Sequence, residues 1–211
     1  MKTDSLIDVL AQDAPLRTRF GPVLVFATLG GVAFVAAVFF SILGFRPDID
    51  TALATGRFLF KLLLTLVLAA SAIGVVSRFA RPGRNPGAWG WALAAVPVLL
   101  LVALACELTM TPPSLWMSKL IGHNSLHCLS LIPLFALGPL AALLYALRQG
   151  APARPGLAGV LAGLAASGIA AIFYATNCTD DSPLFVATWY SLATAIVVGI
   201  GYLAGSRLLR W

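Results

Sequence analysis

Six long runs of apolar residues, separated by short polar segments, dominate the sequence. Each run is close to the length of about 20 helical residues that crosses the hydrocarbon core of a membrane. The runs are continuously apolar, whereas strands of a membrane β-barrel alternate apolar and polar positions. We therefore expect an all-α membrane protein with six transmembrane helices. These lie approximately at Val23–Leu43, Phe58–Val76, Ala88–Cys106, Leu126–Leu147, Leu157–Tyr174 and Phe185–Leu203.

The composition excludes most soluble classes. Of the 211 residues, 60% are hydrophobic and only 10% are charged, whereas a soluble domain has roughly 25% charged residues. This is too little charge for a soluble enzyme, a disordered chain or a nucleic-acid-binding domain. The chain divides into an N-terminal segment, residues 1–20, and a six-helix transmembrane domain, residues 21–211. No small-residue cleavage site follows the first run, so we expect a retained span and no removed signal peptide.

The basic residues indicate the orientation, because Lys and Arg are enriched in cytoplasmic loops. With six spans, the two termini share one side of the membrane with the even-numbered loops. That side holds ten of the 14 Lys and Arg residues, against four in the odd loops and adjoining helix ends. We therefore expect both termini in the cytoplasm. The four basic residues on the opposite side are Arg46, Arg57, Lys61 and Lys119.

Lys61 is the one basic residue drawn into an apolar span. Either its long side chain reaches the outer interface, or it pairs with an acid from an outer loop, such as Asp180 or Asp181. Asp50 is expected to cap an early start of the second helix.

Small residues predict where two helices come close. The fifth span carries Gly159 and Gly163, and the sixth carries Gly201 and Gly205. Both pairs have the GxxxG spacing that allows helix backbones to approach in a membrane. We expect contact between helices at these positions.

Residues 1–20 predict a short cytoplasmic amphipathic helix. Its stripe comprises Leu6, Ile7 and Leu10, and its acids are Asp8 and Asp13. It either lies along the lipid headgroups or docks into a groove on a basic partner protein. Acidic residues disfavour an anionic membrane surface, and a transcription factor would be a suitable basic partner.

All three cysteines and both histidines map to the outer side. Thiolate and imidazole bind zinc-like and softer metals, and two close thiols can form a disulfide in an oxidising compartment. There is no CxxC or HExxH spacing, and each residue alone would read as ordinary packing. Together they favour a redox or transient heavy-metal role. The residues concerned are Cys106, His123, His127, Cys128 and Cys178, with Asp180 and Asp181 beside the last.

Several segments resemble a known family. The start, TDSLIDVLAQDAPLR, is similar to the N-terminal segment of the NrsF family, negative regulators of the sigma F factor. The resemblance is stronger in NSLHCLSLIPLFALGPLAALLYALRQGAPARPGLAGVLAGLAA, NCTDDSPLFVATWY and the closing RLLRW. It covers nearly the whole chain.

The resemblance implies a six-span inner-membrane anti-sigma factor. Such a protein holds an extracytoplasmic-function sigma factor at the membrane and releases it under heavy-metal or oxidative stress. Two outer cysteines perceive the stress, and they correspond to Cys128 and Cys178. Cys106 is not part of that pattern, and nothing is carried over for the histidines.

Two other functions are compatible with six spans. A small-molecule or metal-ion transporter would usually place ionisable residues near the membrane midplane, and the spans lack them. A thiol oxidoreductase would usually show CxxC or a cofactor motif. We expect no enzyme activity and no direct contact with nucleic acid.

Overall fold

A computed structural model describes residues 7, 20–81, 83, 85–150 and 152–209 of the protein. The described residues form helices and connecting turns, with no strand among them. Six helical stretches are long and apolar enough to cross a membrane, so the predicted class and number of spans are confirmed. The long helices are α2 (Phe20–Ile42), α4 (Gly56–Phe79), α5 (Ala88–Met110), α7 (Ser125–Leu147), α8 (Pro155–Asn177) and α10 (Ser191–Leu208).

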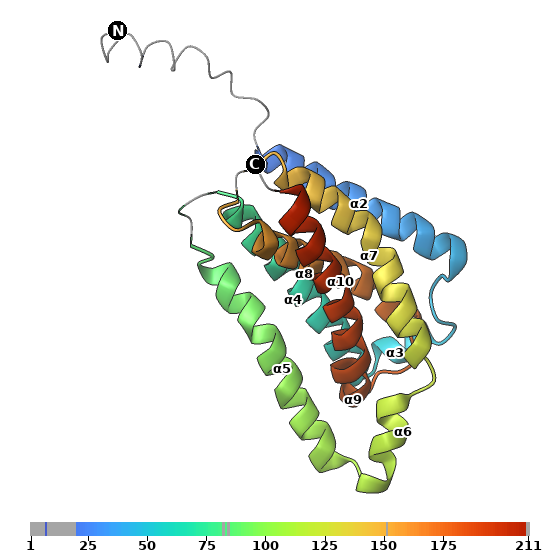
Figure 1. Ribbon diagram of the computed structural model, residues 1–211. Coiled ribbons are helices and arrows are strands. Elements are labelled where there is room, and N and C mark those ends of the chain that lie inside the picture. The colour runs from blue at the N-terminus through green and yellow to red at the C-terminus, as the bar shows by residue number, and fades with distance from the viewer. Residues whose placement is uncertain (1–6, 8–19, 82, 84, 151, 210–211) are drawn as a thin grey trace.

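The long helices alternate in direction, so that α2 begins and α10 ends at the same end of the molecule (Figure 1). We call this the proximal end. The opposite, distal end comprises residues 43–55, 111–124 and 178–182. Its short elements, together with those that follow residue 182, are α3 (Ile49–Leu53), the 3₁₀ turn Pro113–Leu115, α6 (Trp116–Ile121), α9 (Pro183–Phe185) and the π-helical turn Val186–Tyr190.

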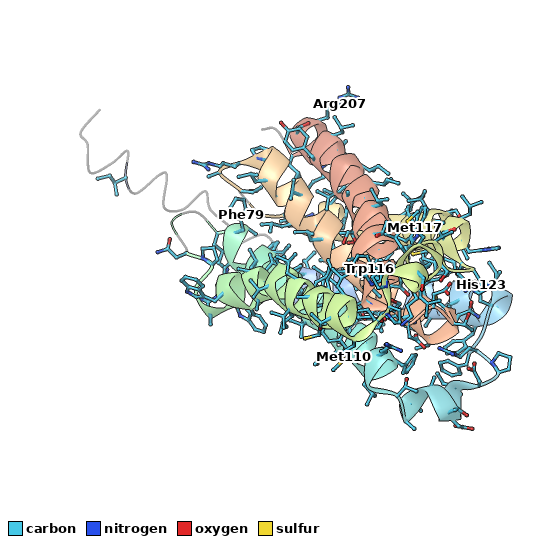
Figure 2. The ribbon with its side chains drawn as sticks, turned by 90° about the horizontal axis from the view of Figure 1, so that it is seen from below. Phe79, Met110, Trp116, Met117, His123 and Arg207 are labelled. Carbon is cyan, nitrogen blue, oxygen red and sulfur yellow. The ribbon has the colours of Figure 1, made fainter. Side chains whose placement is uncertain are left out.

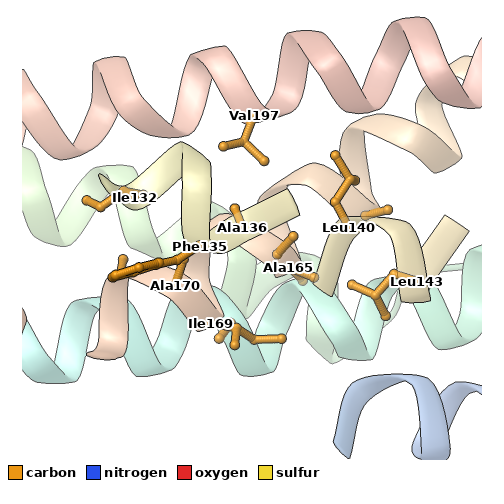
Figure 3. Packing of buried hydrophobic residues seen from close by; sticks show 14 of the residues in the cluster. Ile132, Phe135, Ala136, Leu140, Leu143, Ala165, Ile169, Ala170 and Val197 are labelled. Carbon is orange, nitrogen blue, oxygen red and sulfur yellow. The ribbon is translucent and has the colours of Figure 1, made fainter. Parts of the chain in front are cut away.

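Helix α8 is the centre of the bundle, with α10, α4 and α7 packed around it. Its buried positions are mostly alanine and glycine, which let the neighbouring helices approach closely. Larger side chains of α7, among them Phe135 and Leu143, fill the space beside Ile169 of α8 (Figure 3). The core therefore combines small residues on α8 with large ones on its neighbour.

The closest approach is between α8 and α10. A Cβ atom on Gly159 would lie 2.0 Å from the carbonyl oxygen of Gly201 and 3.0 Å from Cα of Gly205. A Cβ atom on Gly163 would lie 2.8 Å from Cα of Val198. Only glycine fits at these points, and the contact predicted from the GxxxG spacings is confirmed.

Helix α5 stands at the edge of the bundle and packs mainly on α4 (Figure 1). At the proximal end the ring of Trp89 covers Gly74, where a Cβ atom would come within 2.2 Å of it. Further along, α5 borders a cavity of about 460 Å³ shared with α4, α8 and α10. Its lining is almost entirely apolar and includes Val96, Leu164 and Val198.

The start of α4 differs from the prediction. Thr55, not Asp50, caps this helix, and the Thr55 hydroxyl accepts a hydrogen bond from the backbone N–H of Phe58 at 3.4 Å. Asp50 instead lies in the first turn of the separate helix α3. The apolar run alone did not reveal the break, because Ala52 and Ala54 suit either arrangement.

Candidate functional site

The distal end brings together three segments that are far apart in the sequence. Residues 178–182 connect α8 to α9 and lie at the centre of this end. Their neighbours come from the connection between α2 and α3, the end of α5 and the start of α7. Figure 2 views the molecule from below, with Trp116 and His123 labelled among the distal residues.

Two of the three cysteines are buried at this end. Cys128 is in the first turn of α7 and is 0% exposed, and Cys178, which follows α8, is 1% exposed. The thiols are near enough that a charge on one would act on the other. The Cys178 thiol donates to the carbonyl oxygen of Asp180 at 3.9 Å. Burial raises the pKa of Cys178, so it is a protonated thiol at neutral pH.

Two tyrosines complete the surroundings of the thiols. Tyr174 and Tyr190 are buried, with their ring centroids 6.1 Å apart. The Tyr190 hydroxyl is next to the Cys178 thiol, and it has no well-formed hydrogen bond within the described part of the chain. The thiols therefore lie in a protected environment of aromatic rings and hydroxyl groups.

A group of charged side chains holds the backbone at Cys178. Lys61 of α4 is 0% exposed; its ammonium group donates to the Cys178 carbonyl oxygen at 2.8 Å and forms an ion pair with Asp181. Arg46 donates to Asp181 at 2.8 Å and to Asp48 at 2.7 Å. The hydrogen bond to Asp48 raises the pKa of Arg46, which stays charged. Of the two roles considered for Lys61, pairing with a loop acid is the one found.

Asp180 holds the start of α7. Its carboxylate accepts hydrogen bonds from the backbone N–H groups of His123 and Asn124, at 3.0 and 2.8 Å, and from the Asn124 side-chain amide at 2.9 Å. Carboxylates bind well at a helix N-terminus, because the first N–H groups have no partner within the helix. Asp180 thus fixes the turn of α7 that carries Cys128.

A second charged group joins α5 to the same loop. Glu107 is 5% exposed and lies 2.9 Å from Arg57 and 2.8 Å from Lys119. It also accepts hydrogen bonds from Thr111 at 3.2 Å and from Ser182 at 3.5 Å. The end of α5 is therefore tied to α4, α6 and residues 178–182.

In the described part of the chain, the side chains of the other residues considered for a metal do not form a ligand set with the two thiols. Cys106 is exposed on α5, and His127 is exposed on α7. The His123 ring is 96% exposed, 3.7 Å from Asp180. Asp181 is engaged by Lys61 and Arg46. Within the described residues, no three His, Cys, Asp or Glu side chains are arranged to hold a metal ion.

Of the apolar stripe and acids predicted in residues 1–20, one residue lies within the described part of the chain. Leu6, Asp8, Leu10 and Asp13 lie outside the described residues, whereas Ile7 is described and is 57% exposed.

Sequence reasoning assigned Arg46, Arg57 and Lys119 only to topology and overlooked their partners. It also assigned no role to Glu107. One available signal was the balance of charge on this side, where five acids accompany four bases. Buried opposite charges in a membrane protein generally pair.

The chain is similar over nearly its whole length to a described family of proteins. The family described as "Negative regulator of sigma F" (NrsF) matches residues 10–211. The chain belongs to the NrsF family. It is 36% identical over 216 residues to "Anti-sigma-F factor NrsF" of Caulobacter vibrioides, with both chains covered completely. It is 32% identical over 214 residues to "Probable anti-sigma-F factor NrsF" of Azospira oryzae, again over the full length of both. No solved structure matches the chain.

Proposed function

We propose that this NrsF family member is an anti-sigma factor of the bacterial inner membrane. It holds an extracytoplasmic-function sigma factor and releases it under heavy-metal or oxidative stress. The full-length similarity to two anti-sigma-F factors supports this most strongly. The six candidate spans and the buried thiol pair agree with a receptor that works across a membrane.

The excess of Lys and Arg among the proximal loops and terminal segments favours a cytoplasmic proximal end and a periplasmic distal end. Cys128 and Cys178 would then face the compartment that stress agents reach first. Two neighbouring thiols can bind a soft metal ion after each releases its proton to water. They can alternatively transfer two electrons to an oxidant, release two protons and form a disulfide.

The signal must then reach the sigma factor. The sigma-binding and releasing states differ in free energy, and a ligand at the thiols favours release only by binding that state more tightly. The sigma factor would bind the segment of residues 1–20, through the apolar stripe and acids described above. This arrangement separates the sensing end from the binding end by the length of the bundle.

Co-purification tests this function. The full-length protein, extracted in mild detergent, should retain the sigma factor and lose it when cadmium is added. The Cys128→Ser, Cys178→Ser double variant should retain the sigma factor under cadmium, whereas Cys106→Ser should behave as wild type. Normal release from the double variant would show that these thiols are not the sensor.

Two further measurements test the geometry of the proposal. In a Cys106→Ser, Cys128→Ser, Cys178→Ser background, a membrane-impermeant thiol reagent applied to intact spheroplasts should label an introduced cysteine at Asp50→Cys but not one at Arg154→Cys. The reverse result would invert the assignment of sides. Deletion of residues 2–15 should abolish sigma retention while the protein still accumulates in the membrane. Unchanged retention would place the binding surface elsewhere.

A further inference from the structure

The charged group around Lys61 is attached to the same residue that carries the buried thiol. We propose that Lys61, supported by Arg46 and Asp181, is a positioning residue for Cys178. It keeps the thiol buried and sets the concentration of metal at which the protein responds. This inference rests on the proposed function, and it concerns residues with no role in that function so far.

The contacts act on the backbone at Cys178 itself. Its carbonyl oxygen accepts from the Lys61 ammonium group at 2.8 Å and from Arg46 at 3.4 Å. Three residues later, the Asp181 carboxylate pairs with the same two cations. The backbone N–H of Arg46 also donates to the carbonyl oxygen of Thr176 at 3.1 Å. The chain is thus held on both sides of Cys178.

Burial makes this arrangement sensitive to the loss of any member. Lys61 is 0% exposed and Arg46 is 7% exposed, and both cations lie near the ring of the fully buried Phe58, at 5.5 and 5.8 Å from its centroid. A buried charge whose partner is removed is left without solvation, so breaking such a pair is far more costly than breaking one in water. Lys61 cannot keep its charge in place unless residues 178–182 stay where they are.

Steric fit connects this arrangement to the thiol. Cys178 is 1% exposed, so a metal ion or an alkyl group on its sulfur requires residues 178–182 to shift. A shift of the Cys178 carbonyl withdraws an acceptor from Lys61. Either helix α4 then moves with the loop, or the Lys61 ammonium group has to be hydrated by water. Since α4 runs from this loop to Phe79 at the proximal end, it offers a continuous element along which that change can extend.

The first test measures the accessibility of Cys178 alone. In a Cys106→Ser, Cys128→Ser background, the rate of alkylation by N-ethylmaleimide is followed in membranes. Lys61→Met keeps most of the side-chain length but removes the charge, and we expect the rate to rise about tenfold, the scale of one lost charge-assisted hydrogen bond. Lys119→Met is the matched control: it removes another distal lysine, paired with Glu107, and should leave the rate unchanged.

Asp181→Asn provides a second variant in case Lys61→Met does not accumulate. It preserves the shape of the side chain while removing its charge, and it should raise the alkylation rate in the same direction. An alkylation rate equal to that of the parent in both variants would overturn the inference.

The second test measures release of the sigma factor with all native cysteines present. Lys61→Met should lower the cadmium concentration for half-release about tenfold, because the same contact that hides the thiol opposes its reaction. A general folding defect would instead lower retention at every cadmium concentration, zero included. If alkylation accelerates in Lys61→Met but neither wild type nor any variant releases the sigma factor with cadmium, the proposed function fails and the positioning role stands. The opposite result is that wild type releases the sigma factor with cadmium, while Lys61→Met changes neither the alkylation rate nor the cadmium concentration for half-release. In that case the positioning role fails and the proposed function stands.

Discussion

The two ends of the bundle are held together by different interactions. At the distal end, buried ion pairs and hydrogen bonds join the loops, with Lys61, Arg46 and Glu107 as their centres. Toward the proximal end, α8 and α10 meet through glycine backbones, and Trp89 covers Gly74. Lipid is as apolar as a leucine side chain, so burying apolar surface does little to bring helices together in a membrane. The molecule uses both remaining means, polar contacts at one end and close packing at the other.

The difference has a consequence for how each end can change. Packing between glycines depends on shape alone, because it involves no ionisable or reactive side chain. The distal contacts involve charges and thiols, which respond to metal ions, oxidants and protons. The reactive groups described above therefore lie in the part of the molecule that is held by polar contacts.

The largest effect is expected at the close helix contact. Gly159→Val would place side-chain atoms against the backbone of α10, which cannot yield, and should cost about 3 kcal/mol or more. Gly199→Val is the control, since nothing lies within 4 Å of a Cβ atom at that exposed position of α10. Unfolding by sodium dodecyl sulfate in mixed micelles measures both variants. Equal stability of the two would contradict the close approach of α8 and α10.

A smaller effect is expected from the charged group on α5. Glu107→Gln keeps the shape of the side chain but removes the charge that faces Arg57 and Lys119, and should cost roughly 1–2 kcal/mol. Asp50→Asn changes an exposed distal acid and should cost less than about 0.5 kcal/mol. The same denaturation assay compares them. If the Asp50 change were the more damaging, α3 and not α5 would anchor the distal end.

The smallest effect is expected at Asp48, whose carboxylate is 52% exposed beside Arg46. The hydrogen bond from Arg46 lowers the pKa of Asp48. Its contribution to stability is therefore present above the ordinary carboxyl pKa, about 3.9, and is lost as the pH falls through the lower folded value. Wild type should be slightly more stable than Asp48→Asn at neutral pH, and thermal melts at decreasing pH should converge. A gap that widens on acidification would contradict this pairing.

The sequence was a good guide to the helices and a partial guide to the site. Continuous apolar runs predicted all six long helices, and the glycine spacings predicted the contact between α8 and α10, because both signals are local. The pairing of Lys61 with Asp181 was one of two alternatives, since the residues are 120 positions apart and spacing cannot bring them together. The role of Asp180 at the start of α7 was missed for the same reason. Exposure of Cys106 also depends on which face of α5 meets the bundle, and α5 has no strong periodicity to reveal it.

Each residue of the loop between α8 and α9 contacts a particular neighbouring segment. Cys178 and Asp181 contact α4 and the connection between α2 and α3. Thr179 and Asp180 contact Asn124 just before α7, and Ser182 contacts Glu107 of α5. Five consecutive residues therefore contact three different helices or their first residues. Only one alignment of the loop with these helices lets all of the contacts form together. Adding or deleting a single residue here would misalign every later partner at once. Natural variation in length should accordingly be confined to other connections, such as the arginine-bearing turns at the opposite end.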